Sequence, residues 1–171
     1  FNGARAGFIA GFTGNGSIPS GCNAVYTSAY NKALAEAQSN VSVGISDFAK
    51  NIDDSAKANA VDATNQAIYN GYNQASDGYT SKLNGNVDSA NNNSAYLAGV
   101  NMAQDEQNGL NEAIATPAKT PSGSASYVTA FNATLAGYAD GKNGTTAHQT
   151  PTGNDVNQSR VYQDAYAEAV S

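Results

Sequence analysis

The chain has 171 residues and is acidic, with a formal net charge of −6 and a sequence pI near 4.4. Its few Lys and Arg residues are scattered, and an acidic surface repels phosphate backbones, so nucleic acid is excluded as a partner. The sequence has no run of about 18 apolar residues, so we expect no membrane insertion within it.

The sequence contains few of the large apolar residues that usually form a protein core. Leu, Ile, Val and Phe together stay below the roughly one-fifth of residues that marks an ordinary packed core. The small net charge argues against disorder, so we expect a core of Ala, Tyr and the few large aliphatic residues. Such a core buries less apolar area per residue than a Leu-rich one, and we expect modest stability unless neighbouring repeats contribute.

Helical spacing of apolar residues predicts six segments, over residues 3–13, 24–38, 45–82, 94–114, 125–139 and 159–170. The long third segment is expected to break near Ser55 or Ala60, because Asp53-Asp54-Ser55 is typical of a helix start. The other predicted N-caps are Asn23, Ser94, Ser126 and Ser159. The predicted stops are Gly14, Gly85, Gly141 and the segment with Pro117 and Pro121.

These segments define the expected fold class and domain organisation. No strand-like run is longer than Val41-Ser42-Val43, so the chain is expected to be all-α, as a helical bundle or stacked helical hairpins built from Tyr/Ala-rich repeats. We treat residues 1–171 as a single repeat module. A subdivision near residues 115–124, the best linker in the sequence, is the alternative.

A short motif recurs six times: a large apolar or aromatic residue, Ala or Gly three places on, and usually a second large residue beside it. The copies begin at Phe1, Tyr26, Ile68, Tyr96, Tyr127 and Tyr162. On a helix this spacing places two bulky residues around a small one on a single stripe, and the small residue lets another backbone approach closely. Recurrence of this kind favours scaffolding and surface interaction over catalysis.

The two ends of the chain also match each other. Residues 1–12 align without a gap on residues 127–138, and after Gly-rich loops that each hold a proline, residues 25–30 match residues 161–166. The first and last segments are therefore interpreted as copies of one helix-loop-helix unit. We expect the chain to be one period of a larger array together with the start of the next period.

The tyrosine stripe is expected to be core, and the alternative is an aromatic row that binds a ligand. In four copies an asparagine follows the second large residue, namely Asn31, Asn73, Asn101 and Asn132. Helix interiors disfavour Asn, so we predict hydrogen bonds from these amides to a neighbouring helix or a Tyr hydroxyl. If the stripe instead binds glycans, the candidate residues are Tyr30, Asn31, Tyr72, Asn73 and Tyr166.

The sequence offers little catalytic or metal-binding chemistry. His148 is the sole histidine and lies in a polar loop with no Cys nearby, so neither a metal site nor a cofactor is predicted. Acidic residues are more often helix-dipole partners or solvating charges than catalytic pairs, so no catalytic residue is assigned among Asp53, Asp54, Asp105, Glu106 and Asp140. The alternative, a secreted wall-active hydrolase, would need a cleft gathering two of these acids, or Cys22 beside His148.

Three features resemble the helical repeat regions of large cell-wall-anchored surface proteins, or adhesins, of lactobacilli and related lactic-acid bacteria. They are the Tyr-x-x-Ala/Gly-Tyr/Phe-Asn motif, the Ala-Gly-Tyr-x-Asp-Gly run at residues 136–141 and the Asn/Ala/Gln/Ser-rich background. The resemblance implies a non-enzymatic extracellular stalk or adhesive module in adhesion or aggregation, attached to the cell wall through other parts of the parent protein. The implied partners are neighbouring repeats of the same chain and host or microbial glycans or mucin.

Overall fold

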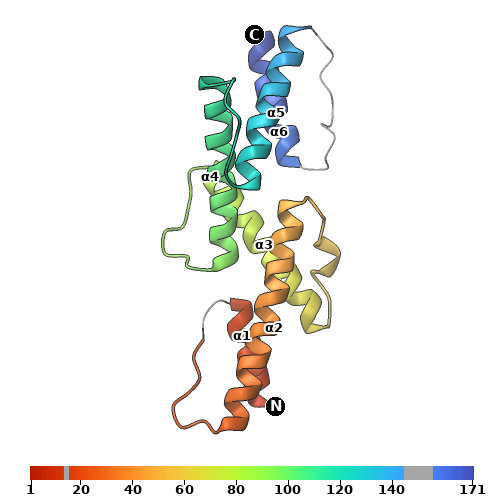
Figure 1. Ribbon diagram of the computed structural model, residues 1–171. Coiled ribbons are helices and arrows are strands. Elements are labelled where there is room, and N and C mark those ends of the chain that lie inside the picture. Colours follow the sequence, from red (N-terminus) through yellow and green to blue (C-terminus); the bar gives the residue numbers. More distant parts are fainter. Residues whose placement is uncertain (14–15, 145–155) are drawn as a thin grey trace. The chain divides into compact units, whose positions relative to one another are not determined.

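The computed structural model describes residues 1–13, 16–144 and 156–171, and the expected all-α class is confirmed (Figure 1). The described residues contain no strand, and successive helices pack against one another in chain order. The helices are α1 (Asn2–Thr13), α2 (Ala24–Ala49), α3 (Ala63–Leu83), α4 (Ser94–Ala115), α5 (Ala125–Lys142) and α6 (Val156–Val170), with a short 3₁₀ helix η1 (Ser55–Lys57) before α3.

Packing divides the chain into two compact units. Unit 1 comprises residues 1–48 and 52–100, and unit 2 comprises residues 49–51 and 101–171. The division falls inside α4, between Val100 and Asn101, whereas the proline-containing linker at 115–124 connects α4 to α5 within unit 2.

Unit 1 has a small core of alanines, aromatic rings and a few aliphatic side chains. Its buried cluster consists of Val41, Ala67 and Ala95, against which Phe8, Phe12 and Ile45 pack. Phe48 meets the edges of Tyr72 and Tyr79, with ring centroids 5.7 and 5.6 Å apart. Edge-to-face aromatic pairs of this kind add about 1 kcal/mol to the apolar burial. The aromatic rings therefore supply much of the area that Leu would provide in an ordinary core.

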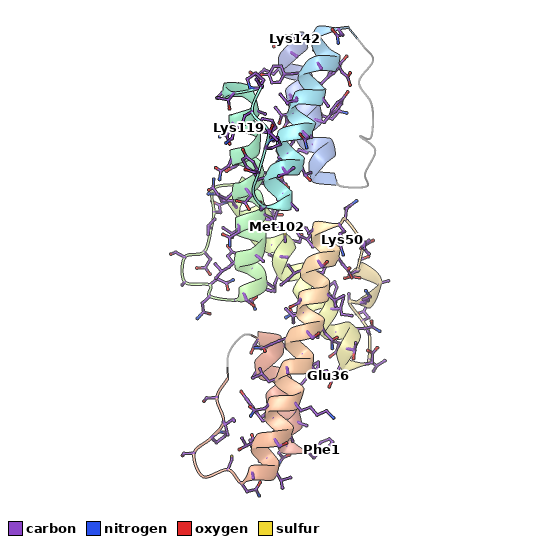
Figure 2. All side chains as sticks on the ribbon, in the orientation of Figure 1. Phe1, Glu36, Lys50, Met102, Lys119 and Lys142 are labelled. Atoms are coloured by element: carbon purple, nitrogen blue, oxygen red, sulfur yellow. The ribbon has the colours of Figure 1, made fainter. Side chains whose placement is uncertain are left out.

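Unit 2 repeats this composition around α5 and α6. Its buried cluster consists of Ala130, Ala133, Val161 and Tyr162, with Leu110 and Tyr166 packed against it. Tyr162 and Phe131 are the largest fully buried side chains of the described residues. Figure 2 shows the described side chains as sticks on the ribbon, with Lys142 labelled at the end of α5. Both units therefore bury Ala and aromatic residues, as the composition indicated.

Paired helices run in the same direction. Along α1, Gly3, Gly7 and Gly11 lie against Tyr26, Tyr30 and Leu34 of α2, so the contacts keep the same order on both helices. The contacts between α5 and α6 are ordered in the same way. A parallel neighbour requires a connection that returns along the whole helix, about 18 Å for the 12 residues of α1. This need explains the long connection before α2, which Figure 1 shows running back beside the pair.

The boundary between the second and third predicted segments differs from its prediction. The segment expected over residues 24–38 continues to Ala49, because Ala37, Val41 and Gly44 extend the buried face of α2 at helical spacing. The predicted break in residues 45–82 is present, but α3 begins at Ala63. Its N-cap is Asp62, whose side chain accepts a hydrogen bond from the Asn65 amide. The Asp53-Asp54-Ser55 signal instead precedes η1.

Four other helix starts test the predicted caps. Asn23 caps α2 as predicted, with its side-chain oxygen 2.9 Å from the Tyr26 amide nitrogen. At α4 the capping side chain is Asn93, one residue before Ser94, and it accepts from two backbone amides. At α5 the prediction of Ser126 is wrong, because Ser124 accepts from the Tyr127 amide. Helix α6 begins at Val156, so Ser159 lies inside it.

Of two helix ends predicted at glycines, one is found at the glycine and the other is not. Gly85 follows α3 with a φ of 72°, a left-handed conformation that glycine adopts without strain. Gly141 is wrong as a stop, because it is a buried residue within α5 and the helix ends at Lys142. Gly144, with a φ of 64°, follows the end of α5. Helix α4 ends at Ala115, before the proline segment, as expected, while Gly14 lies outside the described residues.

Candidate functional site

The helices touch one another through glycines, in contacts that we call glycine seams. A Cβ placed on Gly7 would be 2.0 Å from the Tyr30 carbonyl oxygen, and one on Gly78 would be 1.9 Å from that of Tyr96. Similar contacts with a partner backbone occur at Gly44, Gly71, Gly99, Gly109 and Gly137. Since the nearest atom in each case is a backbone oxygen, the two helix backbones are in direct contact, with no room for a side chain.

The seam between α1 and α2 pairs small residues with a tyrosine-rich stripe. In α1 the glycines recur every four residues, which keeps them on one face of the helix. Gly3 and Gly7 meet the backbone of Tyr26 and Tyr30. The small position of the motif is itself a seam residue in the copies at Ile68 and Tyr96, where Gly71 and Gly99 meet a partner backbone. In the copy at Tyr26 it is instead the backbone of the large residues that the glycines of α1 meet.

The two matching helix pairs use this motif in different registers. Tyr162 and Tyr166 of α6, the counterparts of Tyr26 and Tyr30, meet Gly137 and Gly141 of α5. In the self-alignment Gly137 corresponds to Gly11, not to Gly3. The partner helix is therefore shifted by about two turns between the two pairs.

The tyrosines of the stripe are covered rather than displayed. Tyr30, Tyr79, Tyr96 and Tyr162 are at most 6% exposed, and the other six tyrosines are half-buried. Among the candidate binding residues, Tyr30 is buried, and Tyr72 and Tyr166 are half-buried. These three tyrosines lie on α2, α3 and α6, with Tyr166 in unit 2 and the others in unit 1.

The recurring asparagines do not make the predicted contacts. Asn31, Asn101 and Asn132 are exposed, so the expectation that they bond to a neighbouring helix is wrong for them. Asn73 is half-buried, and its amide nitrogen lies 3.4 Å from the Asp77 carboxylate on its own helix. Their position after the second large residue turns the side chain away from the seam, because the next helical position lies about 100° around the axis.

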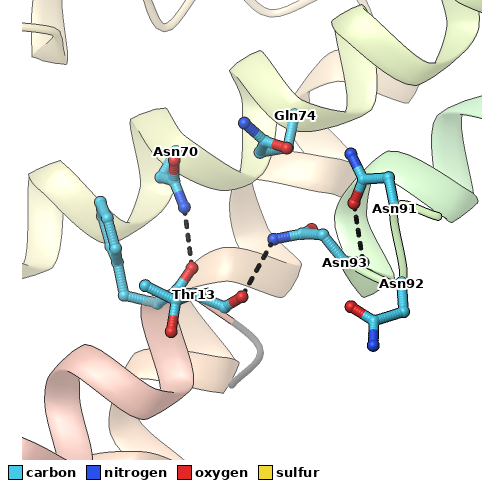
Figure 3. Close-up of a pocket in the computed structure, with 7 residues that line it drawn as sticks. Thr13, Asn70, Gln74, Asn91, Asn92 and Asn93 are labelled. Carbon is cyan, nitrogen blue, oxygen red and sulfur yellow. Dashed lines mark hydrogen bonds between the residues drawn. The ribbon is translucent and has the colours of Figure 1, made fainter. Parts of the chain in front are cut away.

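A different group of amides forms a pocket in unit 1, which we call the amide pocket. It has a volume of about 280 Å³ and is lined by Phe12, Thr13, Asn70, Gln74, Asn91, Asn92 and Asn93. Figure 3 shows Asn70 of α3 and Asn93 of the segment before α4 reaching toward the end of α1. Asn70 donates to the Phe12 carbonyl oxygen at 2.8 Å, and Asn93 donates to that of Thr13 at 3.5 Å.

These hydrogen bonds give the pocket a structural role. The last carbonyls of a helix lack partners within it, and here the side chains of Asn70 and Asn93 supply two. Gln74 and Asn92 line the pocket without taking part in these two bonds. Carboxamides beside an aromatic ring offer neutral donors and acceptors together with an apolar face, which is chemistry that suits a sugar or another polyol.

Sequence reasoning missed this pocket. Asn91, Asn92 and Asn93 are adjacent in the sequence and lie between the predicted segments 45–82 and 94–114. Asn70 lies beside the predicted stripe, yet its hydrogen-bond partner Phe12 is 58 residues away. A run of amides immediately before a helix was the available signal, because Asn is favoured at caps and turns.

The acidic residues considered for catalysis bind neighbours. Asp54 is buried and forms an ion pair with Lys57. Glu106, also buried, accepts from Arg160 at 3.2 Å. Asp140 accepts from the Tyr162 hydroxyl at 2.7 Å. Each of these contacts links elements that are separated in sequence or closes a turn, so the three carboxylates have a structural function.

A second polar cluster joins α4, α5 and their connection. Glu112 accepts hydrogen bonds from Lys119 and from the Tyr127 hydroxyl. These bonds, with Lys119 contributing most, hold the pKa of Glu112 below its ordinary value of 4.5. The same carboxylate raises the pKa of Lys119 and of Tyr127, because it favours their protonated forms. The cluster fixes the proline-containing connection against both helices.

The structure describes few groups suited to metal or nucleophilic chemistry. Within residues 1–13, 16–144 and 156–171, no group of three or more His, Cys, Asp and Glu side chains could hold a metal ion. Cys22 is half-buried in the connection before α2, whereas His148 lies outside the described residues. In the described part of the chain, every helix is too short or too polar to be a candidate for crossing a membrane.

Comparison with known proteins adds no identity to this geometry. No family model matches the chain, and no curated protein or solved structure shows significant similarity to it.

Proposed function

We propose that this chain is a non-enzymatic, extracellular surface repeat module that acts as a stalk in bacterial adhesion or aggregation. The observation that carries the proposal is the glycine seam, which recurs from one helix pair to the next. Direct backbone contact leaves little freedom for the helices to move apart, because a gap of about half to one ångström forfeits roughly a quarter to a half of the dispersion attraction. A chain of such pairs is suited to holding other parts of a protein at a distance.

Two further features support a spacer over an adhesive surface. Tyr30, Tyr79, Tyr96 and Tyr162 are buried, which leaves these four rings little surface for contact with a glycan. The internal match between residues 1–12 and 127–138 fits an array in which one kind of helix pair is used again. The surface location and the part in adhesion come from the resemblance to repeat regions of lactic-acid bacterial surface proteins.

A second candidate function is glycan binding, at the amide pocket and not at the tyrosine stripe. Gln74 and Asn92 favour this candidate, since their carboxamides line the pocket, as Phe12 does, and take no part in the two capping bonds. Neutral sugars are the ligands of choice because the pocket lining carries no charged side chain. The pocket and the stripe thus make different predictions about which substitutions abolish binding.

A glycan and mucin array separates the two functions. The stalk proposal predicts no specific binding by the wild-type chain. Binding that a Gln74→Ala/Asn92→Ala double variant loses, while a Tyr30→Phe variant keeps it, would replace the stalk with the amide-pocket adhesin. Circular dichroism of each variant checks that its helices remain folded. Exposed Asn31→Ala is the matched control, because it removes an amide that is away from the pocket.

The location is tested separately on the source cells. An antibody raised against this chain should label intact cells, and brief protease treatment of those cells should remove the label. Labelling only after lysis would contradict the extracellular location while leaving the spacer role intact.

A further inference from the structure

The outer face of α1 is a groove lined by apolar side chains. The groove has a volume of about 570 Å³, and α1 contributes Phe1, Ala4, Arg5, Phe8 and Ile9 to it. Phe1 is fully exposed and Ile9 is 49% exposed. The remaining lining residues are Ala33 and Glu36 of α2 and Ala63 and Gln66 of α3. Figure 2 labels Phe1 and Glu36 on the two helices that frame it. A contiguous exposed apolar patch of this kind is typical of an interaction site.

The matching face of α5 is covered by a helix of this same chain. In the ungapped alignment of residues 1–12 on 127–138, Ala4 and Arg5 correspond to Ala130 and Phe131. Ala130 and Phe131 are 1% and 0% exposed, whereas Ala4 and Arg5 are exposed. Helix α4 contributes to this cover, because its Gly109 lies against the Tyr127 carbonyl oxygen and the Ala130 side chain. Ala130 also belongs to a buried cluster with Val161 and Tyr162 of α6.

The agreement extends along both helices. Phe1 corresponds to Tyr127, which contacts α4 through Gly109 and Glu112. Ile9 corresponds to Leu135, and Leu135 lies with α4 residues Ala113 and Ile114 around a shared pocket. Positions that α4 covers on α5 are therefore the positions that line the open groove on α1.

We propose that the outer face of α1 is the seat for a helix with the sequence of α4, contributed by another copy of this repeat and packed as α4 packs on α5. The glycine of such a helix would lie against the backbone at Phe1, as Gly109 does at Tyr127. The inference goes beyond the stalk function, because it concerns how repeats join and holds wherever the protein is located.

Charge supports the choice of an α4-type occupant. Helix α4 carries Asp105, Glu106 and Glu112 and has no Lys or Arg. Arg5 lines the groove and corresponds in the alignment to the buried Phe131. On α4, Glu106 and Glu112 lie three residues before and after Gly109, so all three residues share one region of that helix surface. An α4-type helix that places its glycine at Phe1 would therefore bring these two carboxylates within reach of Arg5. The other charged lining residue, Glu36, is negative and does not attract an acidic helix. Arg5 is therefore the lining side chain that favours an acidic occupant.

A fusion protein tests the proposal. Residues 94–126 are placed directly before Phe1 of the full chain, which reproduces the register in which Ser126 precedes Tyr127. Hydrogen exchange of the α1 amides should become at least about tenfold slower than in the original chain, because local opening would then have to break the new seam. Exchange in α5, which keeps its own α4, should be unchanged and serves as the internal control.

A matched variant distinguishes packing of the added helix on α1 from a general effect of extending the chain. Gly109→Leu in the added segment alone should return α1 exchange to its original rate, because that side chain would clash with the backbone at Phe1 while the native Gly109 stays intact. Unchanged α1 exchange in the unmodified fusion would overturn the proposal. Protection of α1 in the original chain that increases with protein concentration would also overturn it, since the face would then serve association between whole chains.

Discussion

Replacing Gly99 by Ala is the most direct test of the glycine seam. A Cβ on Gly99 would lie 1.8 Å from the carbonyl oxygen of Ala75, whereas real Cβ atoms essentially never come within 3.0 Å of another heavy atom. The two helices would have to separate by about 1.2 Å at this point, and a gap of about this size forfeits roughly half of the dispersion attraction between facing atoms. No side chain can move aside to avoid this, because the obstructing atom belongs to the backbone.

The magnitude follows from two opposing effects. Alanine is favoured over glycine in a helix interior by about 1 kcal/mol, which would stabilise the variant if space were available. Overpacking a close-packed contact costs about 1 to 3 kcal/mol or more, and the backbone clash places Gly99 at the upper end. We therefore expect Gly99→Ala to lower the free energy of unfolding by about 2 kcal/mol, the overpacking cost less the propensity gain.

Denaturant unfolding followed by far-ultraviolet circular dichroism measures this change. Asn101→Ala, two residues further along α4 and exposed, is the matched control and should raise stability by up to about 0.5 kcal/mol. Gly141→Ala should be milder than Gly99→Ala, because the first atom in its way is the Ala169 side chain at 2.7 Å. A Gly99→Ala protein as stable as the wild type, or more stable, would refute the backbone-contact seam.

Three further predictions concern polar contacts. The pKa of Glu112 is lowered in the folded chain, so its carboxylate stabilises the fold at pH values above its ordinary pKa of 4.5. That stabilisation is lost as the pH falls through the folded pKa. The free energy of unfolding should therefore decrease less steeply with falling pH in Glu112→Gln than in the wild type, and equal slopes would contradict this. Tyr162→Phe removes the hydroxyl that donates to Asp140 and should cost about 1.5 to 3 kcal/mol in denaturant unfolding, whereas no loss would mean that the bond contributes nothing. Asn70→Ala should speed hydrogen exchange in the last turn of α1, with a stability loss of about 1 kcal/mol, and unchanged exchange there would disprove its capping role.

The helical nature of the chain could be predicted because it depends on local spacing. Large residues separated by three or four positions, with a small residue between them, indicate a helix with one packing stripe. Boundaries were less certain where two signals competed. At residues 39–44 the β-branched Val41 and Val43 and the following Gly44 have low helix propensity, yet Val41 and Gly44 lie on the buried face of α2. Tertiary packing there outweighs local propensity.

The amide pocket could not be predicted, because its parts meet only after folding. Asn70 and Phe12 are 58 residues apart, and Asn93 and Thr13 are 80 residues apart. No local pattern specifies which asparagine reaches a distant carbonyl. The recurring position after the second large residue favoured Asn31, which is exposed, while the asparagine two places before Tyr72 makes the contact between helices.

The parallel direction of the paired helices was likewise absent from the sequence pattern. A stripe of small residues permits close approach by a partner running either way, since the backbone of one helix meets the backbone of the other. The length of the connection does carry information, because an antiparallel neighbour needs only a few residues. The segments between α1 and α2 and between α5 and α6 are longer than that, and both pairs are parallel.

The shifted register of the two matching pairs follows from the same property of glycine. On a helix with small residues every fourth position, several sites offer a partner equal access to the backbone, so the seam fixes the distance between helices without fixing their offset. The offset must then be set by contacts outside the seam, such as the Tyr162 hydroxyl on Asp140 in unit 2. Copies of the unit can therefore keep the motif while their connecting loops change in length, as the unequal loops before Val25 and Val161 do. A fold assembled in this way tolerates repetition and loop variation together, which is what a chain of reused helix pairs requires.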